Sequence, residues 1–164
     1  MNNKTSLSLL LLFISLYSFA QVNDDSIRQV VLKNNITDSL YIFGEWNETD
    51  GTETHLNYLG VIKTNNGSFK IMTSCWLWGL SKRATNRILV FSESNNYLGN
   101  YNLVTKADLP ERIENNQLVF LHSTSNSCDK EIITRLLFEN GIPEDFFLEC
   151  EDGLGDIYSF EHEK

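Results

Sequence analysis

The fold of this chain is decided by residues 68–103, which read SFKIMTSCWLWGLSKRATNRILVFSESNNYLGNYNL. The stretch contains two of the three tryptophans and the longest apolar runs in the middle of the chain. Turn-forming residues precede it at 65–67 (Asn-Asn-Gly) and interrupt it at 94–96 (Ser-Asn-Asn). Because Asn and Gly tolerate the positive φ angles of tight hairpins, the pattern predicts successive β-strands joined by short turns.

The most clearly predicted hairpin pairs residues 54–64 with the start of this stretch. Alternate side chains of a strand face opposite sides of its sheet. In the second strand one face therefore holds Phe69, Ile71, Thr73 and Cys75, and the other holds Lys70, Met72, Ser74 and Trp76. In the first strand, alternation places Leu56, Tyr58, Gly60 and Ile62 together on one face.

About nine short strands follow one another along the chain, nearly all of them joined by turns of hairpin length. Beyond the hairpin, they are expected at 39–46, 87–93, 97–104, 117–122, 131–138, 145–150 and 156–161. We also expect a strand rather than a short helix at 27–33, because Val30 and Val31 are β-branched. The chain is therefore predicted to be all-β, a single antiparallel meander that closes as a barrel or packs as a sandwich.

One short helix is expected near residues 108–115. Asp108 can cap its start, and Pro110 suits the first turn of a helix, where its missing N–H is not needed.

Residues 1–20 have the features of a secretory signal peptide. Lys4 supplies a short positive region, residues 7–19 are apolar and rich in Leu, and Ser18 and Ala20 are small residues suited to a cleavage site. The apolar run is shorter than the roughly 20 residues that a membrane-spanning helix needs. We therefore expect residues 21–164 to form a single β-rich domain that is secreted or periplasmic and not transmembrane after signal removal.

The three cysteines predict one disulfide bond. Two of them would pair in an oxidising compartment, and Cys128 and Cys150 flank a predicted hairpin. Cys75 lies among apolar neighbours in a strand, so we expect it to be a buried free thiol. A bridge between Cys128 and Cys150 closes a loop of roughly 20 residues. In the chain-entropy model such a bridge stabilises the folded state by about 3 kcal/mol.

Charge is distributed unevenly. The net charge of −9 becomes −10 once Lys4 leaves with the signal peptide, so nucleic acid and anionic membrane surfaces are poor partners. Residues 63–112 carry seven basic side chains against three acidic ones, whereas 129–164 carry eleven acidic against three basic. Two interpretations remain open. Either acidic strands lie beside the basic ones and neutralise them, or the basic region binds a partner.

The predicted partner-binding residues lie in and after the Trp-Leu-Trp sequence. They are Trp76, Trp78, Lys82, Arg83 and Arg87. Aromatic and Arg side chains together are typical of interface anchors and of carbohydrate or anion sites. The partner could be a protein, a glycan or a small ligand.

No catalytic motif, metal site or cofactor is predicted. The histidines at 55, 122 and 162 belong to no recognised hydrolase pattern, and the acidic residues at 149–156 lack the spacing of a calcium loop. Cys75 could form a Cys/His pair with His55 or His122 if their strands are neighbours. A buried Cys and a solvated His are the expected alternative.

The expected function is therefore binding without catalysis, at a β-sheet surface and outside the cytoplasm. A small secreted hydrolase is one alternative. A second alternative comes from Gly44-Glu45-Trp46, which resembles the G-x-W signature of lipocalins, although here it follows a strand instead of opening the first one. That resemblance implies a barrel around a small apolar ligand.

Overall fold

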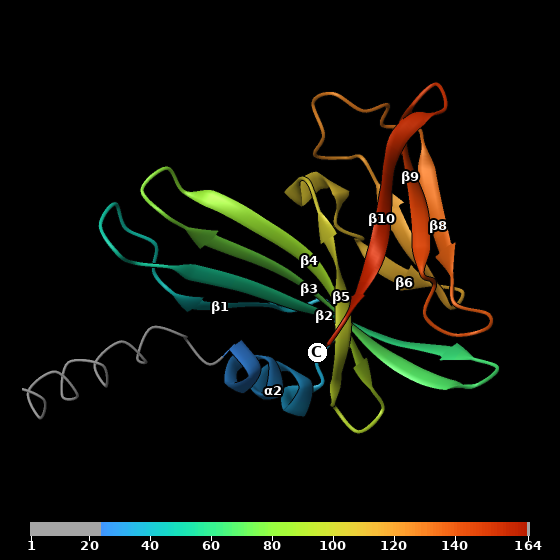
Figure 1. The fold of residues 1–164 in the computed structure, drawn as a ribbon, viewed down its shortest axis with the longest axis horizontal. Coiled ribbons are helices and arrows are strands. Elements are labelled where there is room, and N and C mark those ends of the chain that lie inside the picture. The colour runs from blue at the N-terminus through green and yellow to red at the C-terminus, as the bar shows by residue number, and fades with distance from the viewer. Residues whose placement is uncertain (1–23, 164) are drawn as a thin grey trace, which may run out of the picture.

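Ten β-strands make up most of residues 24–163, the part of the chain that the computed structural model describes (Figure 1). The strands are β1 (Leu40–Gly44), β2 (Glu53–Thr64), β3 (Gly67–Trp78), β4 (Arg83–Ser92), β5 (Tyr97–Leu103), β6 (Arg112–Glu114), β7 (Gln117–Leu121), β8 (Ile133–Leu137), β9 (Asp145–Glu151) and β10 (Leu154–His162). One α-helix, α2 (Asp24–Asn34), and one 3₁₀ turn, η2 (Lys106–Asp108), accompany them. The mainly β fold class is confirmed. The expected signal peptide at 1–20 lies outside the described residues.

The strands form two antiparallel sheets rather than one continuous meander. The larger sheet has the order β1-β2-β3-β4-β5-β10-β9, and β6-β7-β8 form a second sheet of three strands. Strands β1 to β5 follow the expected meander, after which β10 returns to pair with β5 through residues 160–162. The larger sheet ends in two edge strands, and residues 24–163 form no closed barrel, so of the two arrangements that the sequence left open the barrel is not formed.

The β2–β3 hairpin is confirmed, but a bulge divides its faces. The register shifts between Tyr58 and Gly60, so side chains before and after this point exchange sides of the sheet. Leu56 and Tyr58 consequently pack in one core, whereas Ile62 packs in the other. The shared face expected for these residues is therefore wrong, because strict alternation assumes a regular ladder.

Residues 27–33 form part of helix α2 and not a strand. Val31 and Leu32 are buried against the sheet, and Asp24, Asp25 and Lys33 carry the charges that suit the two helix ends. The helix ends at Asn34, and the next residue, Asn35, caps it in the left-handed conformation, with a φ of 51° and a hydrogen bond from its N–H to the Val31 carbonyl oxygen. Tertiary packing of an amphipathic face thus overrides the β preference of two adjacent valines.

The short helix expected near 108–115 is replaced by a shorter helical turn and a strand. The helical turn is only η2, at residues 106–108, and residues 112–114 form strand β6, which pairs with β7. The reason is the turn between these strands, where Asn115 and Asn116 both have positive φ, the geometry that a two-residue β-hairpin requires.

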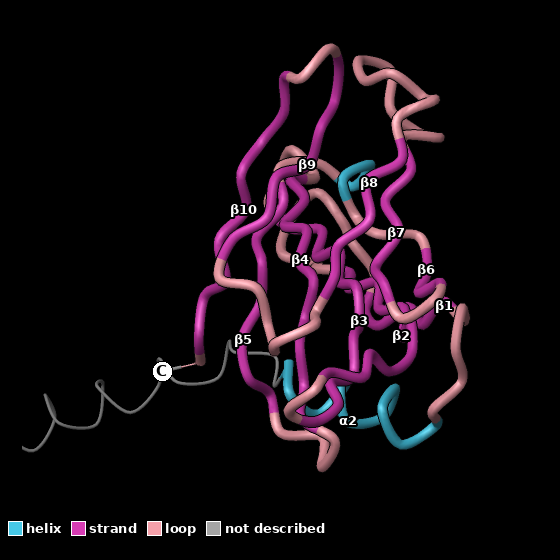
Figure 2. The backbone as a smooth tube through the Cα atoms, turned by 90° about the vertical axis from the view of Figure 1, so that its right-hand side faces the viewer, coloured by secondary structure: helices cyan, strands magenta, loops and turns pink. Residues whose placement is uncertain are grey.

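Two apolar cores lie on opposite faces of the larger sheet. The larger core joins the two sheets and includes Ile71, Ile88, Leu118 and Phe120. The smaller core lies under α2, where Val31 and Leu32 meet Met72 and other sheet residues. Figure 2 shows α2 at the opposite end of the molecule from the turn between β9 and β10. Within residues 24–163, no helix has the length and apolar character to cross a membrane.

Candidate functional site

Four of the five predicted partner-binding residues share one face of strands β3 and β4. Trp78 lies directly opposite Arg83 in the β3–β4 ladder, Trp76 opposite Thr85, and Ser74 opposite Arg87. Met72, two residues before Ser74, is on the same face of β3 and is covered by α2. We call Trp76, Trp78, Arg83 and Arg87 the aromatic–basic face.

The side chains of this face are held by one another. The rings of Trp76 and Trp78 stack with their centroids 5.6 Å apart, and the Arg83 guanidinium lies 5.6 Å from the Trp78 ring centroid. The indole N–H of Trp78 donates to Thr85 Oγ1 at 3.0 Å. Arg87 donates from Nε to Asn102 Oδ1 at 3.0 Å. The rings and guanidinium groups are therefore pre-positioned on the sheet rather than free to rotate.

The aromatic–basic face is the uncovered end of a surface whose other end lies under α2. Trp76 retains 36% of its surface exposed although it lies in the middle of the sheet, and Arg83 is exposed. A Trp with this much exposure on a central strand is not explained by core packing alone.

Lys82, the fifth predicted residue, is placed apart from the other four. It lies in the turn between β3 and β4, where its ammonium sits 4.9 Å from the ring centroid of Trp46. Trp46 in turn donates its indole N–H to Gly79 O at 2.9 Å, which ties the β1–β2 loop to the β3–β4 turn at one end of the sheet (Figure 1). Trp46 was missed as a neighbour of this region, because sequence distance hides a contact between two loops.

The basic side chains here are not neutralised by the acidic parts of the chain. Within residues 24–163, neither Lys82, Arg83 nor Arg87 has a carboxylate at ion-pair distance. The pairs formed by Arg residues elsewhere are local, such as Arg135 with Glu114 at 2.7 Å. Internal neutralisation therefore does not account for the basic charge of this face.

The opposite face of the same strands contains a cavity of about 300 Å³ with a mixed polar and apolar lining. Its walls are Leu40, His55, Asn57, Thr73, Cys75, Lys106 and Leu109. His55 and Cys75 are direct partners in the β2–β3 ladder, so the condition that the sequence set for a Cys/His pair, neighbouring strands, is met. No hydrogen bond joins the two side chains, because His55 Nδ1 has no partner. Cys75 is the buried free thiol that was expected, whereas His55 is half-buried and not solvated.

A carboxylate orients the histidine of this cavity. Glu53, two residues before His55 on the same face of β2, interacts with its Nε2 through Oε1. This hydrogen bond is the main reason why the pKa of Glu53 lies below its usual value. Burial raises the pKa of the Cys75 thiol, and the nearby Lys106 ammonium partly offsets that effect.

Three buried polar atoms on this face have no hydrogen-bond partner within the described chain. They are His55 Nδ1, Asn57 Oδ1 and Asn86 Oδ1. Asn86 is directly opposite Cys75 on β4 and is only 2% exposed. Because buried polar groups are nearly always paired, three orphaned atoms around one thiol indicate a place where a ligand or water is bound.

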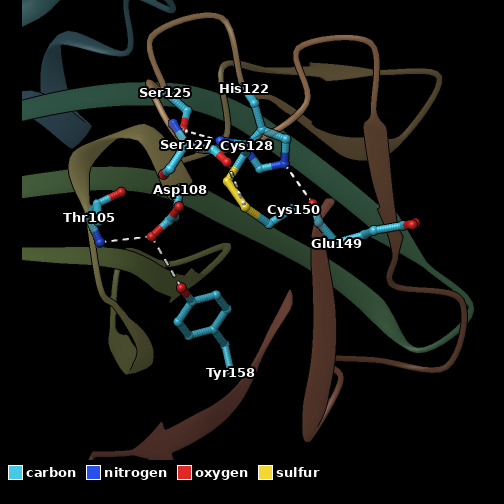
Figure 3. The surroundings of a disulfide bond; sticks show 9 residues. All are labelled: Thr105, Asp108, His122, Ser125, Ser127, Cys128, Glu149, Cys150 and Tyr158. Atoms are coloured by element: carbon cyan, nitrogen blue, oxygen red, sulfur yellow. Dashed lines mark hydrogen bonds between the residues drawn. A yellow bond between two sulfur atoms is a disulfide. The ribbon is translucent and has the colours of Figure 1, made fainter. Parts of the chain in front are cut away.

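The predicted disulfide between Cys128 and Cys150 is present, with the two Cα atoms 4.6 Å apart. It lies beside a smaller cavity of about 130 Å³ that buried polar residues line (Figure 3). His122 bonds through Nε2 to the carbonyl oxygen of Glu149 at 2.7 Å. Asp108 accepts hydrogen bonds from the Thr105 N–H and the Tyr158 hydroxyl. The His122 contact fastens the loop after β7 to β9, and the Tyr158 contact fastens η2 to β10, so both serve the structure of the C-terminal half.

The acidic turn near the C-terminus is arranged as a turn and not as an ion site. Glu149 Oε1 accepts the Gly153 N–H at 3.0 Å, which closes the connection between β9 and β10. Among residues 24–163, no three His, Cys, Asp or Glu side chains are grouped so that they could hold a metal ion.

Comparisons with protein-family models, with curated proteins and with solved structures find no match for this chain.

Proposed function

We propose that the protein is an extracytoplasmic binding protein that captures an acidic protein partner on its aromatic–basic face. The signal-peptide features of residues 1–20 and the disulfide between Cys128 and Cys150 support an oxidising, extracytoplasmic location.

One observation carries the proposal. Two stacked indoles and two arginines without carboxylate partners lie together on an uncovered part of a rigid sheet. Trp and Arg are the residues that most often contribute large shares of binding energy at protein interfaces. Ordering these side chains on binding costs little entropy, because hydrogen bonds already hold Trp78 and Arg87.

The charge of the face favours an acidic partner. Arg83 and Arg87 lie on one face of β4 with Thr85 between them, and guanidinium groups can donate two hydrogen bonds to one carboxylate. The chain without its signal peptide has a net charge of −10, and this face gathers basic side chains that have no carboxylate partner, so it is a favourable place for an acidic partner to bind.

Charge reversal tests the proposal. The immobilised protein is used to capture partners from a native extract, and mass spectrometry identifies the captured proteins. Replacing Arg83 and Arg87 with Glu should abolish this capture. The matched control is Lys63→Glu with Lys130→Glu, which makes the same charge change at exposed positions outside the face. The control should capture the same acidic proteins as the unmodified chain.

The outcomes separate the alternatives. Equal capture by both double variants, with unchanged circular dichroism, would remove the aromatic–basic face as the binding site. Loss of capture after glycosidase treatment of the extract would identify a glycan as the partner and contradict an acidic protein surface.

A further inference from the structure

We propose that the cavity behind the aromatic–basic face is an acyl-transfer site, with Cys75 as nucleophile, His55 as general base and Glu53 as the residue that positions His55. The site would accept a small ester or thioester. This inference is independent of partner binding, because it uses the opposite face of the sheet.

The strand register places the nucleophile beside the base. His55 and Cys75 are directly opposed in the antiparallel β2–β3 ladder and face the same side. Directly opposed residues have Cβ atoms about 4.5–5.5 Å apart, which places the imidazole and the thiol side by side. No hydrogen bond joins them in the structure, where His55 Nδ1 has no partner, so the proposed proton transfer requires the two side chains to move closer when a ligand binds. Both side chains line the same cavity, so a ligand there can reach the sulfur.

The hydrogen bond between His55 and Glu53 leaves Nδ1 of His55 available to take the proton of the thiol. Because the Glu53 carboxylate only accepts hydrogen bonds, His55 Nε2 must carry a proton towards it. In the neutral ring, Nδ1 then holds the lone pair, and Nδ1 is buried without a partner. A carboxylate that fixes the tautomer and a nitrogen that remains basic are the two requirements of a nucleophile–base–orienter triad.

The thiol needs this base. Burial raises the pKa of Cys75, as the Glu53 carboxylate of β2 also does, and only Lys106 of η2 acts against them. The raised pKa disfavours the thiolate, so the proposed attack on a carbonyl includes proton transfer from the thiol to His55 Nδ1.

The cavity walls match an acyl group. Leu40 and Leu109 provide apolar surface at its rim, and Leu40 is 60% exposed. The Lys106 ammonium supplies the positive charge that can stabilise an oxyanion. The orphaned Asn57 Oδ1 is available to accept a hydrogen bond from a donor elsewhere on the ligand, since an ester or thioester group itself has none.

The reaction balances without any further reactant except water. The Cys75 sulfur forms a bond to the acyl carbon as its proton moves to His55 Nδ1, and the bond from the acyl carbon to the leaving oxygen or sulfur breaks. The proton on His55 passes to the leaving group. Water then hydrolyses the thioester on Cys75, which releases the carboxylic acid and restores the thiol.

Acetylation by p-nitrophenyl acetate tests the site in the full chain. The unmodified protein should release p-nitrophenolate in an initial burst of about one equivalent, and peptide mass spectrometry should find the acetyl group on Cys75. His55→Gln should slow the burst by about 100-fold, the usual size of a general-base contribution. His162→Gln changes an exposed histidine elsewhere and should leave the burst unchanged.

A double-mutant comparison tests the positioning role of Glu53. Glu53→Gln should slow acetylation in the unmodified chain and have no further effect in the His55→Gln background, because it acts through His55. If the His55→Gln variant does not fold, Glu53→Gln takes its place in the test. The burst must then be slower in the folded Glu53→Gln variant than in the unmodified protein.

Several results would overturn the inference. Acetylation of lysines alone, or a Cys75 that reacts only at denaturant concentrations that unfold the protein, would make Cys75 an inert core residue. A burst of equal rate in the folded His55→Gln variant would remove His55 as the base.

Discussion

At the scale of the residue, the pleat of β3 separates two sites that are adjacent in sequence. Cys75 lines the cavity, whereas Trp76 belongs to the aromatic–basic face on the other side of the sheet. Trp76 therefore shares its face with Ser74 and not with its neighbour Cys75. A substitution at Trp76 should affect partner capture and leave the thiol chemistry of Cys75 intact.

Tyr101 gives a residue-scale prediction for alkaline pH. It is fully buried on β5, and its hydroxyl donates to the carbonyl oxygen of Pro143. Burial, with the Glu144 and Asp145 carboxylates, raises its pKa above the ordinary value of 10.0. The folded protein thus retains a proton that the unfolded chain loses. Its contribution to stability is complete below pH 10.0 and is lost as the pH rises further.

The corresponding experiment compares Tyr101→Phe with the unmodified protein in urea unfolding at several pH values. At neutral pH the variant should lose about 1 kcal/mol with its hydrogen bond. Above pH 10 the unmodified protein should lose up to about 1.4 kcal/mol per pH unit more steeply than the variant. Parallel pH dependences for the two proteins would contradict the proposed role of this phenol.

At the scale of the element, α2 is held to the sheet by few apolar side chains. Val31 and Leu32 are its buried residues, and they contact the smaller core that includes Met72 and Leu89. An isolated helix of this length is marginal in water, so packing on the sheet must stabilise it. The helix in turn covers part of the face that would otherwise extend the exposed aromatic–basic surface.

Leu32→Ala should therefore destabilise the protein by about 2–5 kcal/mol, the cost of a cavity at a buried leucine. Leu32 is 2% exposed, whereas its neighbour Val30 is 47% exposed. Val30→Ala is the matched control and should change stability by less than about 0.5 kcal/mol. Thermal unfolding followed by circular dichroism measures both. Equal effects of the two substitutions would mean that α2 contributes nothing to the fold by packing.

At the scale of the whole molecule, the C-terminal half depends on links between distant segments. The Cys128–Cys150 disulfide joins the loop after β7 to β9, and Asp129 N–H donates to the carbonyl oxygen of Cys150 at 2.8 Å. β10 then connects this half to the larger sheet through its short pairing with β5. The two halves are therefore coupled through β10 and the common core.

Replacing Cys128 and Cys150 with Ser should lower the free energy of unfolding by about 3 kcal/mol, the value for a loop of this size. Denaturant unfolding of the variant, and of the unmodified protein with and without a reductant, measures the loss. The reduced protein and the double variant should agree. A variant as stable as the oxidised protein would show that the bridge does not constrain the unfolded chain.

The sequence by itself determined the β-rich class, the β2–β3 hairpin and the pairing of Cys128 with Cys150. These features depend on local turn chemistry and on the two-residue period of a strand, both of which can be read within a few residues. The buried state of Cys75 followed from its apolar neighbours in the same way.

Only the tertiary structure decided the rest. The helix at 24–34, the bulge after Tyr58 and the division into two sheets depend on which surfaces meet, and local preferences of about 1 kcal/mol or less are overridden by that packing. The opposition of His55 to Cys75 depends on strand register across 20 residues of sequence. A change of one residue in that register would have placed them on opposite faces.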